Sequence, residues 1–226
     1  MPRIRAELKL LDYRIAEATI AKYLPPQPPG PKRIGSGTWT TFWKNHAAEV
    51  AAIDFFVVST ATFRLLYVLL VLSPDRRRIL HFNVTAHPSA AWTAQQISEA
   101  FPFDAAPKYL VRDNDRIYGR EFTDRIEGIG LVDIRISFHS PWQNPYVERL
   151  IGSIRRECLD HVVVLSERHL KRILTEYFRY HQEARPHQSL DDNSPVPREV
   201  EPPELGPIVS LPYLGGLHHR YGRRAA

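Results

Sequence analysis

Residues 137–160 read Ser-Phe-His-Ser-Pro-Trp-Gln-Asn-Pro-Tyr-Val-Glu-Arg-Leu-Ile-Gly-Ser-Ile-Arg-Arg-Glu-Cys-Leu-Asp, which joins a polar loop to the start of a helix. Prolines and polar residues over 140–145 break regular structure. From residue 146 onward, apolar residues recur at spacings of three and four, the period of an amphipathic helix. Pro145 suits the first helical turn, where its missing N–H is not needed. Glu148 therefore lies in that turn, where the helix dipole favours a carboxylate.

Composition limits the class of protein. The chain has 226 residues and a formal net charge of +5, and this modest basic excess is compatible with nucleic-acid binding. Its one cysteine, Cys158, excludes an intramolecular disulfide and fits a reducing compartment. The longest apolar run, 65–72, is too short for a membrane span, which needs about 20 residues. The N-terminus is charged and lacks a secretory signal, so we expect a cytoplasmic protein.

Hydrophobic periodicity predicts the order of the elements in the middle of the chain. Strands are expected at 50–58, 63–72, 79–85, 109–111 and 132–138, and helices at 90–101, 117–129, from 146 onward and at 167–183. The turn at Ser73-Pro74-Asp75 predicts an antiparallel hairpin of the second and third strands. The helical crossover that follows requires the fourth strand to run parallel to an earlier one.

The flanking regions have a different composition. Residues 1–24 predict two short helices that look like part of a helix-turn-helix, with Ala18 to Leu24 as a candidate recognition helix. The alternative is an amphipathic helix pair packed on the core or on a partner. A complete domain of that kind needs more chain than precedes Arg3, so we expect it to be partial. Residues 25–47 predict a Pro-rich linker, and residues 193–226 a Pro-rich extension with a basic tail.

Pro141, Asn144, Glu148 and Arg149 form a Pro-x-x-Asn-x-x-x-Glu-Arg pattern. This pattern resembles the third catalytic motif of the DDE integrase/transposase superfamily, as found in the integrase catalytic core of bacterial insertion-sequence transposases, kin to retroviral integrases. The segment 180–190 resembles a further signature of that family. The resemblance covers residues 48–192 and implies an α/β, ribonuclease H-like fold: a five-stranded mixed sheet flanked by helices.

Two further acids are candidates for the same site. Asp54 interrupts an apolar strand, which is costly unless the carboxylate is paired with a cation or binds a metal. Asp113 ends the fourth strand, and strand carboxyl ends are where ligand sites gather. The family's second motif has an aromatic residue five positions after its acid, as Tyr118 follows Asp113. Asp115 is the alternative, although the 34 residues between Asp113 and Glu148 match the family's spacing better.

Three carboxylates without a histidine–cysteine cluster indicate a hard metal, Mg²⁺ or Mn²⁺, and not zinc. Two such ions about 3.5–4 Å apart activate the attacking oxygen and stabilise the leaving oxygen at a phosphodiester. Asp54, Asp113 and Glu148 are thus the predicted catalytic residues and metal ligands. The resemblance implies DNA strand cleavage followed by strand transfer at one site.

Other residues near this motif are candidate DNA contacts. Gln143 and Asn144 offer amides to bases or phosphates, with turn formation as the alternative role. Arg149, Arg155 and Arg156 are candidate phosphate contacts, with a solvated helix face as the alternative.

The leading interpretation is a transposase/integrase catalytic domain acting on element ends and target DNA, on the nucleoid of a bacterium. A catalytically inactive, DNA-binding transposase relic and a ribonuclease H-like nuclease without strand transfer are the alternatives. The resemblance also implies a homo-oligomer, for which Leu211, Tyr213 and Leu214 are candidate apolar contacts.

Overall fold

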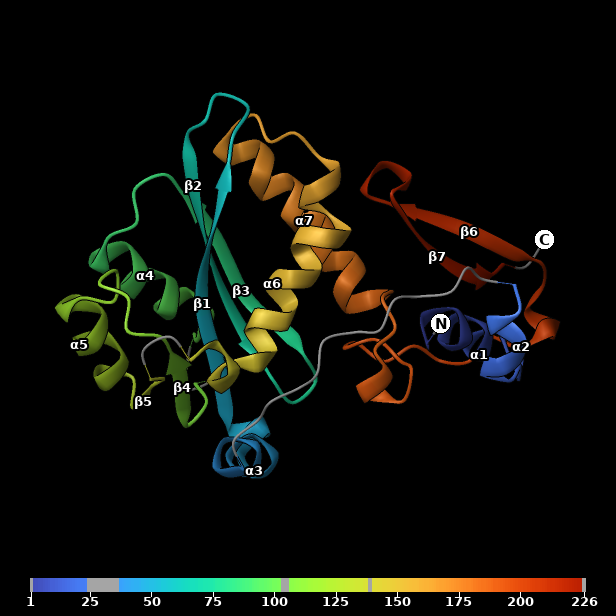
Figure 1. The fold of residues 1–226 in the computed structure, drawn as a ribbon, viewed down its shortest axis with the longest axis horizontal. Coiled ribbons are helices and arrows are strands. Elements are labelled where there is room, and N and C mark those ends of the chain that lie inside the picture. Colours follow the sequence, from blue (N-terminus) through green and yellow to red (C-terminus); the bar gives the residue numbers. More distant parts are fainter. Residues whose placement is uncertain (1, 24–36, 103–105, 138–139, 225–226) are drawn as a thin grey trace. The chain divides into compact units, whose positions relative to one another are not determined.

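The computed structural model describes residues 2–23, 37–102, 106–137 and 140–224. The chain divides into two compact units (Figure 1). One unit comprises residues 34–172 and contains the main sheet. The other combines residues 1–33 with residues 173–226. The long helix α7 (Glu167–Glu183) runs from the first unit into the second.

The main sheet has five strands in the order β3-β2-β1-β4-β5. The strands are β1 (Val50–Ser59), β2 (Leu65–Ser73), β3 (Arg78–Thr85), β4 (Tyr109–Arg112) and β5 (Val132–Arg135). The first three form an antiparallel meander, whereas β4 runs parallel to β1 and β5 parallel to β4. The predicted hairpin and the predicted parallel crossover are both confirmed.

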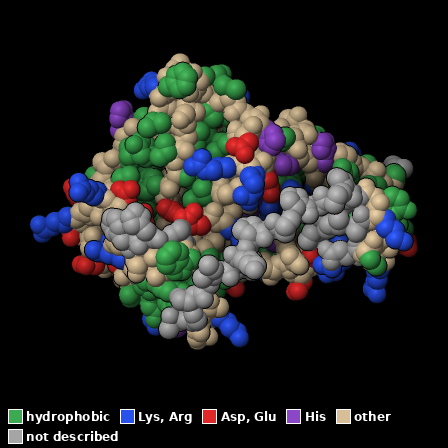
Figure 2. Space-filling view, in the orientation of Figure 1, with side chains coloured by type: hydrophobic (Ala, Val, Ile, Leu, Met, Phe, Trp, Pro, Cys, Tyr) green, Lys and Arg blue, Asp and Glu red, His purple; other side chains and the backbone are tan. Residues whose placement is uncertain are grey.

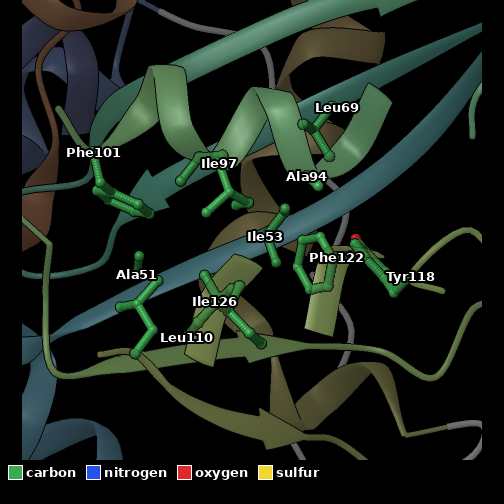
Figure 3. Close-up of a cluster of buried hydrophobic side chains, with 12 residues drawn as sticks. Ala51, Ile53, Leu69, Ala94, Ile97, Phe101, Leu110, Tyr118, Phe122 and Ile126 are labelled. Atoms are coloured by element: carbon green, nitrogen blue, oxygen red, sulfur yellow. The ribbon is translucent and has the colours of Figure 1, made fainter. Parts of the chain in front are cut away.

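Helices cover both faces of this sheet. On one face, α4 (Ala90–Ala100) and α5 (Arg120–Gly128) enclose a cluster of buried hydrophobic residues. Ile53 and Leu69 from the sheet meet Ile97 of α4 and Phe122 of α5 in this cluster (Figure 3). The helix α6 (Pro145–Glu157) lies against the other face, where the Arg155 guanidinium stands 5.9 Å from the centre of the Phe56 ring. Residues of β1 therefore alternate between the apolar cluster and α6.

Part of the predicted linker is a helix. Gly37–His46 forms α3, and Ala47–Glu49 forms a 3-10 turn that leads into β1. The prediction of a connector over this stretch is wrong because its aromatic residues pack on each other and on the sheet unit. The Phe42 ring lies edge-on to Tyr109 at 6.0 Å, and Trp43 is buried. The rest of the predicted linker, residues 25–36, lies outside the described residues.

The second unit brings the two ends of the chain together. It contains α1 (Pro2–Leu10), α2 (Glu17–Ala21) and a hairpin of β6 (Ile208–Tyr213) and β7 (His218–Arg223). The Arg198 guanidinium is buried at its centre, and its Nη1 lies 3.3 Å from the Glu7 carboxylate of α1. Its Nη2 donates to the Tyr221 carbonyl of β7 at 2.8 Å. The predicted C-terminal extension therefore contains a folded hairpin, and the predicted basic tail overlaps its second strand.

Two details of the flanking regions differ from expectation. The candidate recognition helix ends at Ala21, and its last predicted residue, Leu24, lies outside the described residues. Tyr213, predicted as an exposed apolar contact, is buried with its ring 5.6 Å from that of Tyr180. Leu211 remains exposed. Among the described residues, no helix combines the length and the apolar composition that crossing a bilayer requires.

Two phenylalanines test which contacts hold the sheet unit together. Phe122 is fully buried in the α4–α5 cluster, whereas Phe63 is 89% exposed at the tip of the β1–β2 hairpin, where apolar side chains reach the surface (Figure 2). We expect Phe122→Ala to destabilise the protein by about 3–5 kcal/mol. Phe63→Ala should change stability by less than about 0.5 kcal/mol. Urea unfolding measures both changes, and comparable losses would contradict this description of the core.

Candidate active site

Sheet register places the first two acids side by side. Ala52 of β1 pairs with Val111 of β4 in parallel register. Continuing this register by two residues brings Asp54 beside Asp113, which directly follows β4. Asp54 shares a face of β1 with Phe56, and the Phe56 ring lies under Arg155 of α6. Both carboxylates therefore sit at the α6 side of the sheet.

The third acid reaches the same place from α6. Glu148 occupies the first turn of that helix, as the sequence predicted. The loop before the helix is fastened to β1, because the Asn144 side-chain amide donates to the Ile53 carbonyl at 3.3 Å. Ile53 is the residue immediately before Asp54. The first turn of α6 is thereby held against the strand that carries the first acid.

The acids interact electrostatically. The pKa of the Asp54 carboxyl is raised to about 8, first by burial and then by the negative charges of Glu148 and Asp113. A hydrogen bond from the Phe55 N–H to Asp54 Oδ1, 2.8 Å long, opposes this shift. Burial also raises the pKa of Glu148, and the charge of Asp113 raises it further. The three carboxylates thus form one like-charged cluster.

The two candidates for the second acid have different surroundings. Asp113 is half-buried and its charge acts on both Asp54 and Glu148. Asp115 is exposed and turns back into its own loop, where its Oδ1 accepts from the Ile117 N–H at 2.9 Å. Burial raises the pKa of Asp113 as well. These surroundings favour Asp113 over Asp115.

A buried cation lies behind Asp113 that sequence reasoning did not single out. Arg112 donates to both carboxylate oxygens of Asp133, with N–O distances of 2.9 and 2.8 Å, and to the Asp113 carbonyl at 3.0 Å. Its guanidinium also stands 5.0 Å from the centre of the Tyr118 ring. Asp133 is therefore a largely buried partner of this arginine. Arg112 ties β4 to β5 where β4 ends, which fixes the backbone that carries Asp113.

The two amides predicted as DNA contacts are buried. Gln143 is 8% exposed and Asn144 is 1% exposed. The Gln143 Oε1 accepts from the Ser137 N–H at 2.7 Å, and its carbonyl accepts from the Trp43 indole N–H at 3.0 Å. These contacts favour the alternative role, formation of the loop, and contact with DNA remains a prediction for both.

The three arginines lie along the exposed side of α6. Arg155 Nη2 lies 3.4 Å from the Val57 carbonyl of β1, the strand that carries Asp54. The Arg156 guanidinium folds back toward Gly152, where an added Cβ would lie 3.1 Å from its Nη1. Their exposure leaves all three side chains accessible to a phosphate backbone, and their contact with DNA stays a prediction.

The carboxylate cluster suits a divalent cation in its chemistry. Oxygen ligands from three separate elements are the set that Mg²⁺ or Mn²⁺ prefers, and a cation would offset the mutual repulsion of the acids. The buried Asn144 Oδ1 beside the cluster has no hydrogen-bond partner. Within the described part of the chain, no three His, Cys, Asp or Glu side chains are already close enough together to hold a metal. Binding would therefore require their side chains to rotate inward.

Comparison with known proteins shows which proteins this chain is similar to. Residues 132–195, which include Glu148 and α6, match the family model described as the integrase core domain. This segment of the chain is similar to integrase cores. The resemblance to integrases and transposases that the sequence predicted is confirmed.

Two curated proteins that are similar to this chain come from bacterial insertion elements. An uncharacterized 39.2 kDa protein of element IS476 from Xanthomonas euvesicatoria is 27% identical over 143 residues, 61% of this chain and 40% of that protein. An uncharacterized 31.7 kDa protein of element IS407 from Burkholderia multivorans is 27% identical over 154 residues, 65% of this chain and 53% of that protein. The chain thus spans about half the length of these relatives.

Solved structures show the same fold. The catalytic core domain of HTLV-2 integrase, in complex with magnesium, aligns with a TM-score of 0.53 at 10% identity, covering 66% of this chain and 93% of that one. The catalytic domain of Mos1 mariner transposase aligns with a TM-score of 0.51 at 15% identity, covering 61% and 74%. The predicted ribonuclease H-like fold is therefore confirmed.

The raised pKa of Asp54 predicts how metal-free stability depends on pH. The folded chain keeps this proton up to about pH 8, whereas the unfolded chain releases it near pH 4. Raising the pH between these values therefore favours unfolding. With chelator present at pH 8, the midpoint of thermal unfolding of Asp54→Asn should lie at least about 2–4 °C above that of the unmodified chain. This difference corresponds to about 1 kcal/mol in the free energy of unfolding.

At pH 4 the same variant should gain nothing over the unmodified chain. Asp160→Asn, in the exposed turn after α6, is the matched control and should leave the midpoint unchanged at both values. Thermal unfolding followed by circular dichroism measures each midpoint. An equal shift of Asp54→Asn at both pH values would contradict the burial of this carboxyl.

Proposed function

We propose that this chain is the catalytic part of an insertion-sequence transposase, which cleaves DNA strands and joins the freed ends to target DNA. The observation that carries the proposal is the electrostatic interaction of Asp54, Asp113 and Glu148, which come from three parts of the sheet unit. Glu148 lies inside the segment that matches the integrase core domain. Bringing like-charged carboxylates together in a partly buried place costs free energy of folding, and such clusters are typical of sites that bind a ligand. The insertion-element origin of the curated relatives supports transposition as the setting.

Each acid has a distinct part in the proposed site. Asp54 and Asp113, from adjacent parallel strands, would hold the metal from the sheet side, and Glu148 would hold it from α6. Two divalent ions held there would polarise the attacking and leaving oxygens of an in-line displacement at phosphorus. Because cleavage and joining are both such displacements, one site serves both steps and no protein nucleophile is required.

DNA is the proposed partner on chemical grounds. Arg149, Arg155 and Arg156 follow Glu148 on the exposed side of α6 and offer positive charge to a phosphate backbone. We also propose that the chain acts as a homo-oligomer on the bacterial nucleoid. The magnesium complex of HTLV-2 integrase core in a trimeric form is a precedent among its structural neighbours.

Substitution of the acids tests this function. Asp54→Asn, Asp113→Asn and Glu148→Gln should each reduce Mn²⁺-dependent nicking and joining of plasmid DNA by about 100-fold or more. A bound ion contributes several kcal/mol to the transition state, and each 1.36 kcal/mol is worth a factor of ten. Asp115→Asn is the matched control and should retain activity. Calorimetry should show Mn²⁺ binding by the unmodified chain and by Asp115→Asn.

Other outcomes distinguish the alternatives. If Asp115→Asn loses activity and Asp113→Asn keeps it, Asp115 is the second metal ligand, and the proposed reaction stays the same. Nicking without joined products would identify a nuclease. If the unmodified chain neither binds Mn²⁺ nor nicks DNA, the proposed function is wrong and the chain is an inactive relic.

A further inference from the structure

The loop 140–144, directly before α6, contacts both α3 and β1. Its two amide residues, Gln143 and Asn144, are almost fully enclosed, and each bonds to a different part of the sheet unit. Buried polar groups are nearly always hydrogen-bonded, and a fully satisfied network of such bonds makes the local structure rigid. The loop is therefore a candidate for setting where Glu148 lies.

Helix α3 contacts the loop and the start of α6 through Trp43. Trp43 is 3% exposed, and its indole N–H donates to the Gln143 carbonyl at 3.0 Å. The same indole lies edge-on to the ring of Tyr146, with centroids 5.1 Å apart. Tyr146 is in the first turn of α6, two residues before Glu148. One side chain of α3 thus contacts both the loop and the helical turn that carries the third acid.

Asn144 connects the loop to β1 by a hydrogen bond. Its side-chain N–H donates to the carbonyl of Ile53, the neighbour of Asp54, at 3.3 Å. Its own carbonyl accepts from the Glu148 N–H at 3.3 Å. The first and third acids are therefore linked through a single buried residue, so its position sets the separation of their backbones.

The same α3 helix also contacts the strand that leads to the second acid. The rings of Phe42 and His46 lie edge-on to Tyr109, at 6.0 and 5.4 Å. Tyr109 is the first residue of β4, and Asp113 directly follows that strand. Contacts of α3 therefore reach both elements that meet Asp54 at the site.

We propose that α3 and the loop 140–144 form a clamp that positions Glu148 for metal binding, with Trp43 and Asn144 as its positioning residues. The proposal rests on the proposed function, because it assigns Glu148 as a metal ligand. Metal ligands must be held within about 0.5 Å of their productive geometry, and this is usually achieved by the residues that support them. The clamp supplies such support from an element outside the sheet.

The test is a double-mutant cycle in the full chain, with Mn²⁺ alone as the probe. Trp43→Phe removes the indole N–H and should weaken Mn²⁺ binding about 10-fold, as expected for a residue that supports a ligand. Trp142→Phe is the matched control, since Trp142 is in the same loop but 51% exposed, and it should bind Mn²⁺ like the unmodified chain. In a Glu148→Gln background, Trp43→Phe should weaken Mn²⁺ binding no further, because its effect passes through Glu148.

Hydrogen exchange provides a readout that needs no metal. Trp43→Phe should speed exchange of the amides in the first turn of α6, including the Glu148 N–H, whereas Trp142→Phe should not. If Trp43→Phe fails to fold, Tyr146→Leu removes the ring that Trp43 packs on, and should give the same two results.

Two outcomes would overturn the clamp. One is unchanged exchange together with Mn²⁺ affinity like that of the unmodified chain. The other is an equal loss of affinity with and without Glu148. If the unmodified chain binds no Mn²⁺, the proposed function fails on its own, and the exchange rates decide the clamp: faster exchange in Trp43→Phe supports it and unchanged exchange refutes it.

Discussion

The parallel pairing of β1 with β4 is the constraint on which the site depends. It brings Asp54 to the level of Asp113, which directly follows the neighbouring strand. The negative charge of Asp113 there disfavours ionisation of Asp54. An antiparallel or shifted pairing would separate them or turn one to the apolar α4–α5 face. The chain can maintain this unfavourable proximity because the strands are held by a fully buried core on the opposite face.

Buried polar contacts then decide how α6 joins this pair. The apolar face of α6 can pack on the sheet over a range of positions, since hydrophobic burial is not directional. The bonds of Asn144 to Ile53 and of Trp43 to Gln143 are directional and select one position. Arg112 does the same for the strand end before Asp113 through its paired contact with Asp133. The three acids themselves therefore repel one another, while neutral amides and one buried ion pair hold their backbones.

The unit formed by both chain ends is stabilised in a different way. Arg198 links α1, the exit of α7 and β7 through bonds to Glu7, Ala184 and Tyr221. Its carboxylate partner is distant in sequence, so closing this unit costs chain entropy that the buried contacts must offset. The unit therefore depends on residues from the two ends of the chain at once.

The sequence by itself determined the order of the sheet elements, the hairpin, the parallel crossover and the placement of Glu148 in the first turn of a helix. These features follow from hydrophobic periodicity and turn residues, which act between near neighbours. It also marked Asp54, because an acid inside an apolar strand breaks the local pattern. The burial of Gln143 and Asn144, the helix at Gly37–His46, the Arg112–Asp133 pair and the folded C-terminal hairpin were decided only by the tertiary structure. Each depends on partners far away in the chain, such as Trp43 for Gln143 and Glu7 for Arg198, and no local pattern records which distant residue will supply the bond.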